Sequence, residues 1–180
     1  MQKYIALFRG INVVGKNLLL MKELVQILEK LGAKEVKTYI QSGNVLLSHK
    51  ETDTEKLSKK ISASIKKSHG FEPKVLLLNY KDVEKAYKQN PFPEGEEEPK
   101  SVHAFFLSSK PNMPNFEKMD EIKTETERYK LIDKVYYLHT PDGIGRSKLG
   151  ARAEKLLGVP ATARNWRTVI KLQEMIKEFS

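Results

Sequence analysis

Basic residues, glycines and amides gather in one segment near the start of the chain, Arg9–Asn17 (RGINVVGKN). The segment follows a short apolar run and precedes a helical pattern. Glycines let backbone N–H groups turn toward a ligand, and a helix N-terminus favours a bound anion. We therefore expect an anion to bind here through Arg9, Gly10, Asn12, Gly15, Lys16 and Asn17. The alternative is a glycine-hinged turn that carries a surface lysine.

The same segment partly matches a P-loop. Gly10 and Gly15-Lys16 satisfy the GxxxxGK spacing, but Asn17 stands where a Ser or Thr would hold magnesium. No apolar strand ends in the Asp that would form the second nucleotide-binding motif. The sequence therefore disfavours a nucleoside triphosphatase.

A second polar segment surrounds a predicted hairpin turn at 39–44. Ser, Gly and Asn are the residues that a tight turn requires in any case. The side chains that could also reach a ligand are Tyr39, Gln41, Ser42 and Asn44.

Two further candidate segments lie near the end of the chain. Ser147 is placed to cap a helix, and Lys148 stands at the positive end of that helix, where a cation favours a compensating anion. Gly145 before them allows close approach of the backbone. Arg164, beside Asn165 and the only tryptophan, Trp166, could recognise a phosphate, a carboxylate or a base. The alternative for the first segment is a glycine-rich turn followed by a helix cap. The alternative for the second is a buried Trp beside an Asn that only caps the helix.

The net charge of +9 sits at the two ends of the 180-residue chain. Residues 1–50 carry +5, residues 51–140 carry zero, and residues 141–180 carry +4. If the ends meet, they form one basic surface that concentrates anions. The alternative is that the charge only aids solubility.

Composition removes several kinds of chemistry. Without cysteine there is no disulfide, thiolate nucleophile or cysteine-based metal site. The four histidines lack metal-ligand spacing, so we expect neither a metal nor a cofactor. No acid–base pair or activated nucleophile is evident, which leaves open whether the protein is an enzyme. With no apolar run of membrane-spanning length and no signal peptide, we expect a cytoplasmic protein without a membrane partner.

Hydrophobic periodicity predicts an α+β protein. Apolar or alternating runs predict strands over Tyr4–Phe8, Val36–Gln41, Asn44–Ser48, Lys74–Asn79, Val102–Leu107, Tyr129–Ile132 and Val135–His139. Apolar spacings of three and four predict helices over Leu20–Leu31, Thr54–Ser68, Asp82–Gln89, Phe116–Ile122, Ser147–Leu157 and Trp166–Phe179. The first six elements have the order βαββαβ, which is typical of a ferredoxin-like domain.

The domain boundaries follow from a change of composition at 90–100 (NPFPEGEEEPK), which is rich in proline and glutamate. We expect a ferredoxin-like domain over 1–90 and a linker over 91–100. A smaller α+β domain ending in two helices is expected over 101–180, with a topology that the pattern leaves open.

The four polar segments together resemble an uncharacterised bacterial family, domain of unknown function 1697. The stretches that carry the resemblance are YIALFRGINVVGKN, TYIQSGNVLL, DGIGRSKL and ATARNWRTV, and they run from Tyr4 nearly to Leu172. One departure is Val14, where the family usually has glycine (RGINVGGKN). The resemblance implies an α+β fold with a ferredoxin-like N-terminal part, and it implies no activity.

The leading hypothesis is an anion-recognition protein that binds nucleic acid or a nucleotide-like phosphate compound. Its basic surface would be made by both chain ends, with phosphate contacts from Arg9, Lys16, Lys148 and Arg164. One alternative is an enzyme that acts on a small phosphorylated or carboxylated substrate in a cleft between the domains. Another is an interaction module for an acidic protein. The sequence leaves the oligomeric state open.

Overall fold

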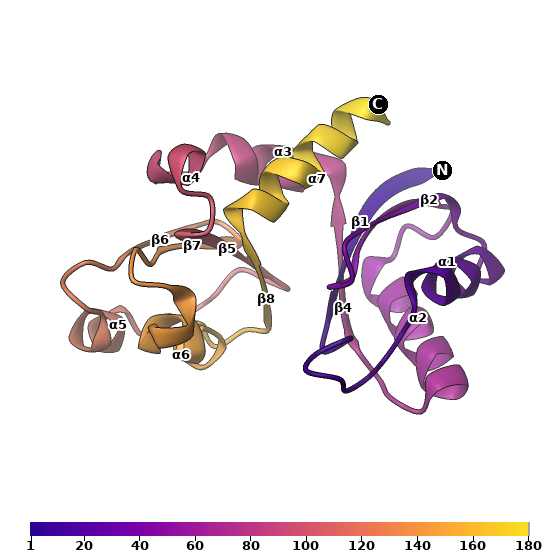
Figure 1. Cartoon of the computed structure of the whole chain (residues 1–180), viewed down its shortest axis with the longest axis horizontal. Helices are drawn as coiled ribbons and strands as arrows, with labels where there is room; N and C mark the ends of the chain where they lie inside the picture. Colours follow the sequence, from indigo (N-terminus) through magenta and orange to yellow (C-terminus); the bar gives the residue numbers. More distant parts are fainter. Residues whose placement is uncertain (180) are drawn as a thin grey trace. The chain divides into compact units, whose positions relative to one another are not determined.

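The computed structural model describes residues 1–179, which divide into two compact units. The N-terminal unit is Met1–Val83, and the C-terminal unit begins at Glu84. The division falls within helix α3 (Tyr80–Lys88), so the proline- and glutamate-rich residues 91–100 belong to the C-terminal unit. Figure 1 shows a sheet with helices in each unit.

The N-terminal unit has the element order predicted from the sequence. Its elements are β1 (Gln2–Arg9), α1 (Met21–Lys30), β2 (Lys34–Tyr39), β3 (Asn44–His49), α2 (Thr54–His69) and β4 (Lys74–Asn79). All paired strands are antiparallel, and their order in the sheet is β2-β3-β1-β4. This arrangement confirms the ferredoxin-like prediction.

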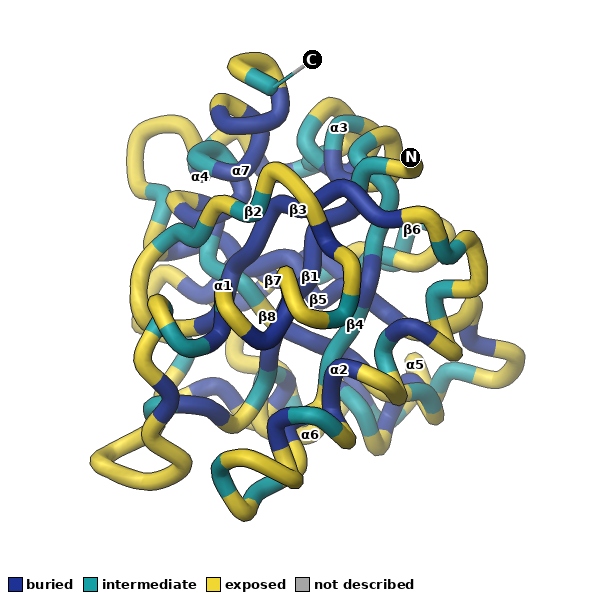
Figure 2. Tube along the Cα trace, turned by 90° about the vertical axis from the view of Figure 1, so that its right-hand side faces the viewer, coloured by how far each residue is buried: buried dark blue, intermediate teal, exposed yellow. Residues whose placement is uncertain are grey.

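The core of this unit lies between the sheet and helices α1 and α2. Alternate residues of β1, such as Tyr4, Ala6 and Phe8, share it with Leu28 and Ile61 of the two helices. The central strands β1 and β3 are buried along most of their length, and Figure 2 shows them in dark blue beneath exposed loops. Burial of these two strands fixes the register, since a one-residue slip would turn the core residues outward.

The C-terminal unit is also α+β. After α3 it contains α4 (Glu94–Glu97), β5 (Val102–Leu107), α5 (Phe116–Ile122), β6 (Arg128–Ile132), β7 (Val135–His139), the 3-10 turn η1 (Ile144–Arg146), α6 (Lys148–Leu157), β8 (Ala161–Asn165) and α7 (Trp166–Glu178). The antiparallel sheet has the order β6-β7-β5-β8. Strand β8 is absent from the sequence prediction, and it completes the sheet by pairing with β5.

Two groups of apolar residues hold the C-terminal unit together. One joins the sheet to α5 and α6 and includes Phe105, Tyr136 and Leu149. The other surrounds Trp166, which is fully buried and stacks on Tyr87 at a ring distance of 5.7 Å. The stacking places Tyr87 of α3 against the first residue of α7, although the two helices are far apart in sequence.

Helix ends agree with the sequence at most positions. Asp53 caps α2 by accepting a hydrogen bond from Lys56 N, and Gly70 ends the helix in the left-handed conformation. The start of α3 differs from the prediction, because the helix begins at Tyr80 and not after Asp82. Asp82 lies in the first turn and its carboxylate accepts from Asn79 N. An acidic side chain there satisfies a free N–H group at the helix start.

Candidate functional site

The loop between β1 and α1 contains a tight hairpin turn at its tip. Val13 and Lys16 exchange two backbone hydrogen bonds, of 2.9 and 3.2 Å, around Val14 and Gly15. Both central residues have positive φ, 48° for Val14 and 72° for Gly15, as a type I′ turn requires. The turn places Lys16 in solvent, at the base of the tip.

The two asparagines of this loop hydrogen bond to its backbone. The Asn12 amide donates to Leu19 O and to Gln41 O, and its oxygen accepts from Leu19 N. The Asn17 amide donates to Gly10 O at 2.8 Å. These bonds make both side chains part of the scaffold that holds Lys16 and the tip in place.

The polar segment at 39–44 forms the turn between β2 and β3. Asn44 is fully buried, and its amide donates to Tyr39 O and Ser42 Oγ. Gly43 lies so close to β1 that a Cβ atom there would be 2.5 Å from Phe8 Cβ. The structure therefore brings this segment beside the β1–α1 loop, with Gln41 and Ser42 exposed and Tyr39 half-buried.

The two C-terminal segments both open helices, as the sequence predicts. Ser147 Oγ accepts from Gly150 N and caps α6, and Asn165 caps α7 by accepting from Thr168 N. Lys148 and Gly145 are exposed. Arg164 is half-buried, and burial lowers its pKa to about 10. Trp166 is fully buried, so in this structure its ring belongs to the core.

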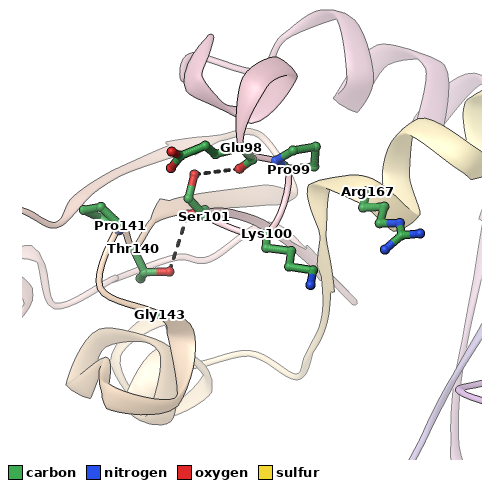
Figure 3. Close-up of a pocket in the computed structure, with 8 residues that line it drawn as sticks. All are labelled: Glu98, Pro99, Lys100, Ser101, Thr140, Pro141, Gly143 and Arg167. Atoms are coloured by element: carbon green, nitrogen blue, oxygen red, sulfur yellow. Dashed lines mark hydrogen bonds between the residues drawn. The ribbon is translucent and has the colours of Figure 1, made fainter.

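A pocket of about 600 Å³ lies in the C-terminal unit, and its walls come from three parts of the chain. They are the segment before β5, the loop after β7 and the start of α7. The lining residues are Glu98, Pro99, Lys100, Ser101, Thr140, Pro141, Gly143 and Arg167, drawn in Figure 3.

Hydrogen bonds fix the floor of this pocket. Ser101 Oγ donates to Glu98 O at 2.8 Å, and Thr140 N donates to Ser101 O at 2.7 Å. Both hydroxyl residues are buried. The two basic side chains, Lys100 and Arg167, are exposed, and no carboxylate of residues 1–179 forms an ion pair with either. The pocket therefore has a floor held by hydrogen bonds within the chain and two exposed basic side chains in its lining.

Titratable groups lie next to the pocket around His139, which directly precedes Thr140. Burial, followed by the nearby Arg128, lowers the pKa of His139. Arg128 Nη2 lies 3.2 Å from His139 Nδ1 and also pairs with Glu94. Hydrogen bonds from its own backbone N–H and from Arg128 lower the pKa of Glu94. A neutral His139 can accept from Arg128, so this network favours the neutral imidazole.

Lys100, Glu98 and Arg167 line the pocket, but their sequence context did not predict them as site residues. Lys100 and Glu98 lie at the end of the acidic stretch that its composition predicts to be a linker. Arg167 directly follows Trp166, which is a predicted site residue. A tertiary contact brings them together, because Trp166 N donates to Pro99 O at 3.1 Å. A contact between residues this far apart leaves no local signal in the sequence.

Metal ligands do not cluster in the described part of the chain. In residues 1–179 no three His, Asp or Glu side chains are placed to share a metal ion. Over the same residues, no helix is both long enough and apolar enough to cross a bilayer.

A family model matches most of the chain. The chain belongs to the family DUF1697, described as a protein of unknown function, which it matches over residues 1–137. Among solved structures it is similar to the conserved bacterial protein SP0830 from Streptococcus pneumoniae, with 25% sequence identity and a TM-score of 0.73. That similarity covers 98% of this chain and 99% of the other. No curated protein matches the chain.

Proposed function

We propose that the protein recognises a small anionic ligand, of the nucleotide-like phosphate class, in the pocket of the C-terminal unit. The observation that carries the proposal is that two basic residues, Lys100 and Arg167, both line one pocket. The two residues come from separate segments, and no carboxylate of residues 1–179 forms an ion pair with either, although Glu98 also lines the pocket. Unpaired cations in a concave site attract anions, and an arginine can hold a phosphate through two parallel hydrogen bonds.

The remaining lining suits the rest of such a ligand. Pro99 and Pro141 offer apolar surfaces for a flat ring, and Glu98 can accept a hydrogen bond from a sugar hydroxyl or an amine. The volume of about 600 Å³ falls within the range of roughly 300–1,000 Å³ that is usual for small-molecule sites.

Isothermal titration with nucleoside monophosphates, sugar phosphates and inorganic phosphate tests this proposal. K100Q and R167Q should each weaken binding by about tenfold, because a hydrogen bond to a charged group is worth about 1.5–3 kcal/mol. K110Q is the matched control, since Lys110 is an exposed lysine of the same unit outside the pocket. Binding that K110Q weakens as much as K100Q, or no binding of any phosphate compound, would contradict the proposal.

A second candidate is nucleic-acid binding, which the charge distribution favours. Residues 1–50 carry +5 and residues 141–180 carry +4, with Lys16 exposed in the β1–α1 loop and Lys148 exposed as the first residue of α6. Phosphate contacts of this kind make affinity fall steeply with salt. K16Q and K148Q should weaken the binding of a single-stranded oligonucleotide and flatten its salt dependence. K100Q, which lies in the neutral stretch 51–140, would leave oligonucleotide binding unchanged, and this separates the two candidates.

A further inference from the structure

Large apolar side chains are exposed together on the N-terminal unit. Eight such side chains are exposed in residues 1–179, and five of them lie in the β1–α1 loop and the β2–β3 turn. We call these five the loop-tip patch: Val13, Val14, Leu18, Leu20 and Ile40. The two loops are tied together by the hydrogen bond from Asn12 to Gln41 O. Grouped exposed apolar residues mark interaction sites, whereas single ones are ordinary.

Val14 shows that the patch has a cost to the fold. Its side chain is 94% exposed and its φ is 48°, a left-handed conformation that a β-branched residue rarely adopts. Glycine or asparagine would fill this turn position without strain. The exposed valine side chain makes little packing contact within the chain, so packing does not offset the backbone strain. An exposed, strained apolar side chain at the tip of a loop is suited to contact with something outside the chain.

The charged residues nearest to the patch in the sequence are basic. From Arg9 to Lys22 the chain has three basic residues and no acidic one, and the segment 40–44 has no charge. Lys16 and Lys22 are exposed beside the apolar side chains. A second copy of the chain would bring like charges together, and the five aliphatic side chains offer no ring on which a base could stack. Protruding aliphatic groups with basic neighbours match an anionic lipid surface.

We propose that the loop-tip patch docks the protein on an anionic bilayer surface. Val14 and Leu18 enter the headgroup region, and Lys16 and Lys22 lie against the lipid phosphates. The attachment is peripheral, by two loops that Asn12 holds together. It is separate from the pocket of the C-terminal unit and does not depend on a ligand there.

Co-sedimentation with vesicles tests the docking. One set contains phosphatidylserine in phosphatidylcholine, and the other contains phosphatidylcholine alone. The wild-type chain should bind the first set and not the second. The double variant V14N/L18Q should bind at least about tenfold more weakly, because it removes apolar contact while asparagine keeps the left-handed turn. K16Q should bind about fivefold more weakly and respond less to salt.

M113Q is the matched control, since Met113 is 90% exposed and lies in the C-terminal unit. It should bind the anionic vesicles as the wild type does. Thermal unfolding shows that each variant is folded before its binding is compared. The proposal is overturned if the wild type ignores the anionic vesicles, or if M113Q loses as much binding as V14N/L18Q. It is equally overturned if V14N/L18Q loses oligonucleotide binding while its vesicle binding is unchanged.

Discussion

The side-chain amide of Asn12 donates a hydrogen bond of 2.9 Å to Gln41 O and so joins two loops that are 29 residues apart in sequence. The same side chain closes the β1–α1 loop on itself through Leu19, as acceptor and as donor. Asn12, which was predicted to contact a ligand, thus uses its side-chain hydrogen bonds to hold the two loops in place. The basic and apolar side chains nearby are the groups left for a partner.

Replacing Asn12 should therefore be costly, and Asn17 offers a close comparison. The two have nearly the same left-handed φ, 52° and 53°, so an alanine adds similar backbone strain at each. N12A loses three hydrogen bonds and N17A loses one. At about 1 kcal/mol per bond, N12A should lower the free energy of unfolding by about 2 kcal/mol more than N17A. Urea unfolding measures both; equal losses would mean that the two additional hydrogen bonds of Asn12 contribute no net stability.

Val14 should be a site where a polar substitution stabilises the protein. Its left-handed conformation costs a residue with a branched side chain roughly 1–2 kcal/mol, and asparagine tolerates it. We expect V14N to raise the free energy of unfolding by about 1 kcal/mol. V13N, at the exposed neighbour whose φ is not positive, serves as the control and should give no gain. A V14N variant no more stable than V13N would show that the turn does not strain the valine.

Gly43 should be the least replaceable glycine of the N-terminal unit. A Cβ atom there would lie 2.5 Å from Phe8 Cβ and 2.7 Å from Ile11 Cδ1, and the residue also has a φ of 78°. Gly10 has a similar φ of 83° but open space around its Cβ position. G10A should cost about 1–2 kcal/mol from strain alone, and G43A about 1–3 kcal/mol more from overpacking. The comparison is read from thermal or urea unfolding, and similar losses would refute the close approach.

Much of this architecture follows from local patterns in the sequence. Apolar spacing located α1 and α2, and the residue types at the helix starts identified the caps Ser147 and Asn165. Strand β8 was not predicted, because its five residues, ATARN, contain only two small apolar side chains and so show no strand-like hydrophobic pattern. Such a strand forms because β5 offers an unpaired edge, which is a tertiary effect.

The acidic segment before β5 shows that composition alone does not predict a long-range contact. Its prolines and glutamates are typical of a solvated connection, yet a Cβ atom at Gly95 would lie 2.8 Å from Trp166 Cδ1. Glycine there admits the indole, and the tryptophan orders the segment that carries Lys100. Composition reports the average character of such a stretch, whereas the pocket depends on one long-range contact.

Finally, His103 on β5 should make the stability of the protein depend on pH. The side chain is 7% exposed, its Nδ1 has no hydrogen-bond partner in residues 1–179, and burial lowers its pKa to about 4. The unfolded chain, with a histidine pKa near 6.5, binds more protons between these values. Stability from neutral His103 is complete above about pH 6.5 and is lost as the pH falls toward about 4, by up to about 3 kcal/mol.

The variant H103L removes this titration and fills the same buried position with an apolar group. The difference in unfolding free energy between wild type and H103L should therefore move in favour of H103L as the pH falls from neutral to about 4.5. Urea unfolding at a series of pH values measures it, and the contribution of His139 cancels because both chains contain it. A difference that stays constant over this range would mean that β5 accommodates the imidazolium as well as the imidazole, and that burial does not depress this pKa.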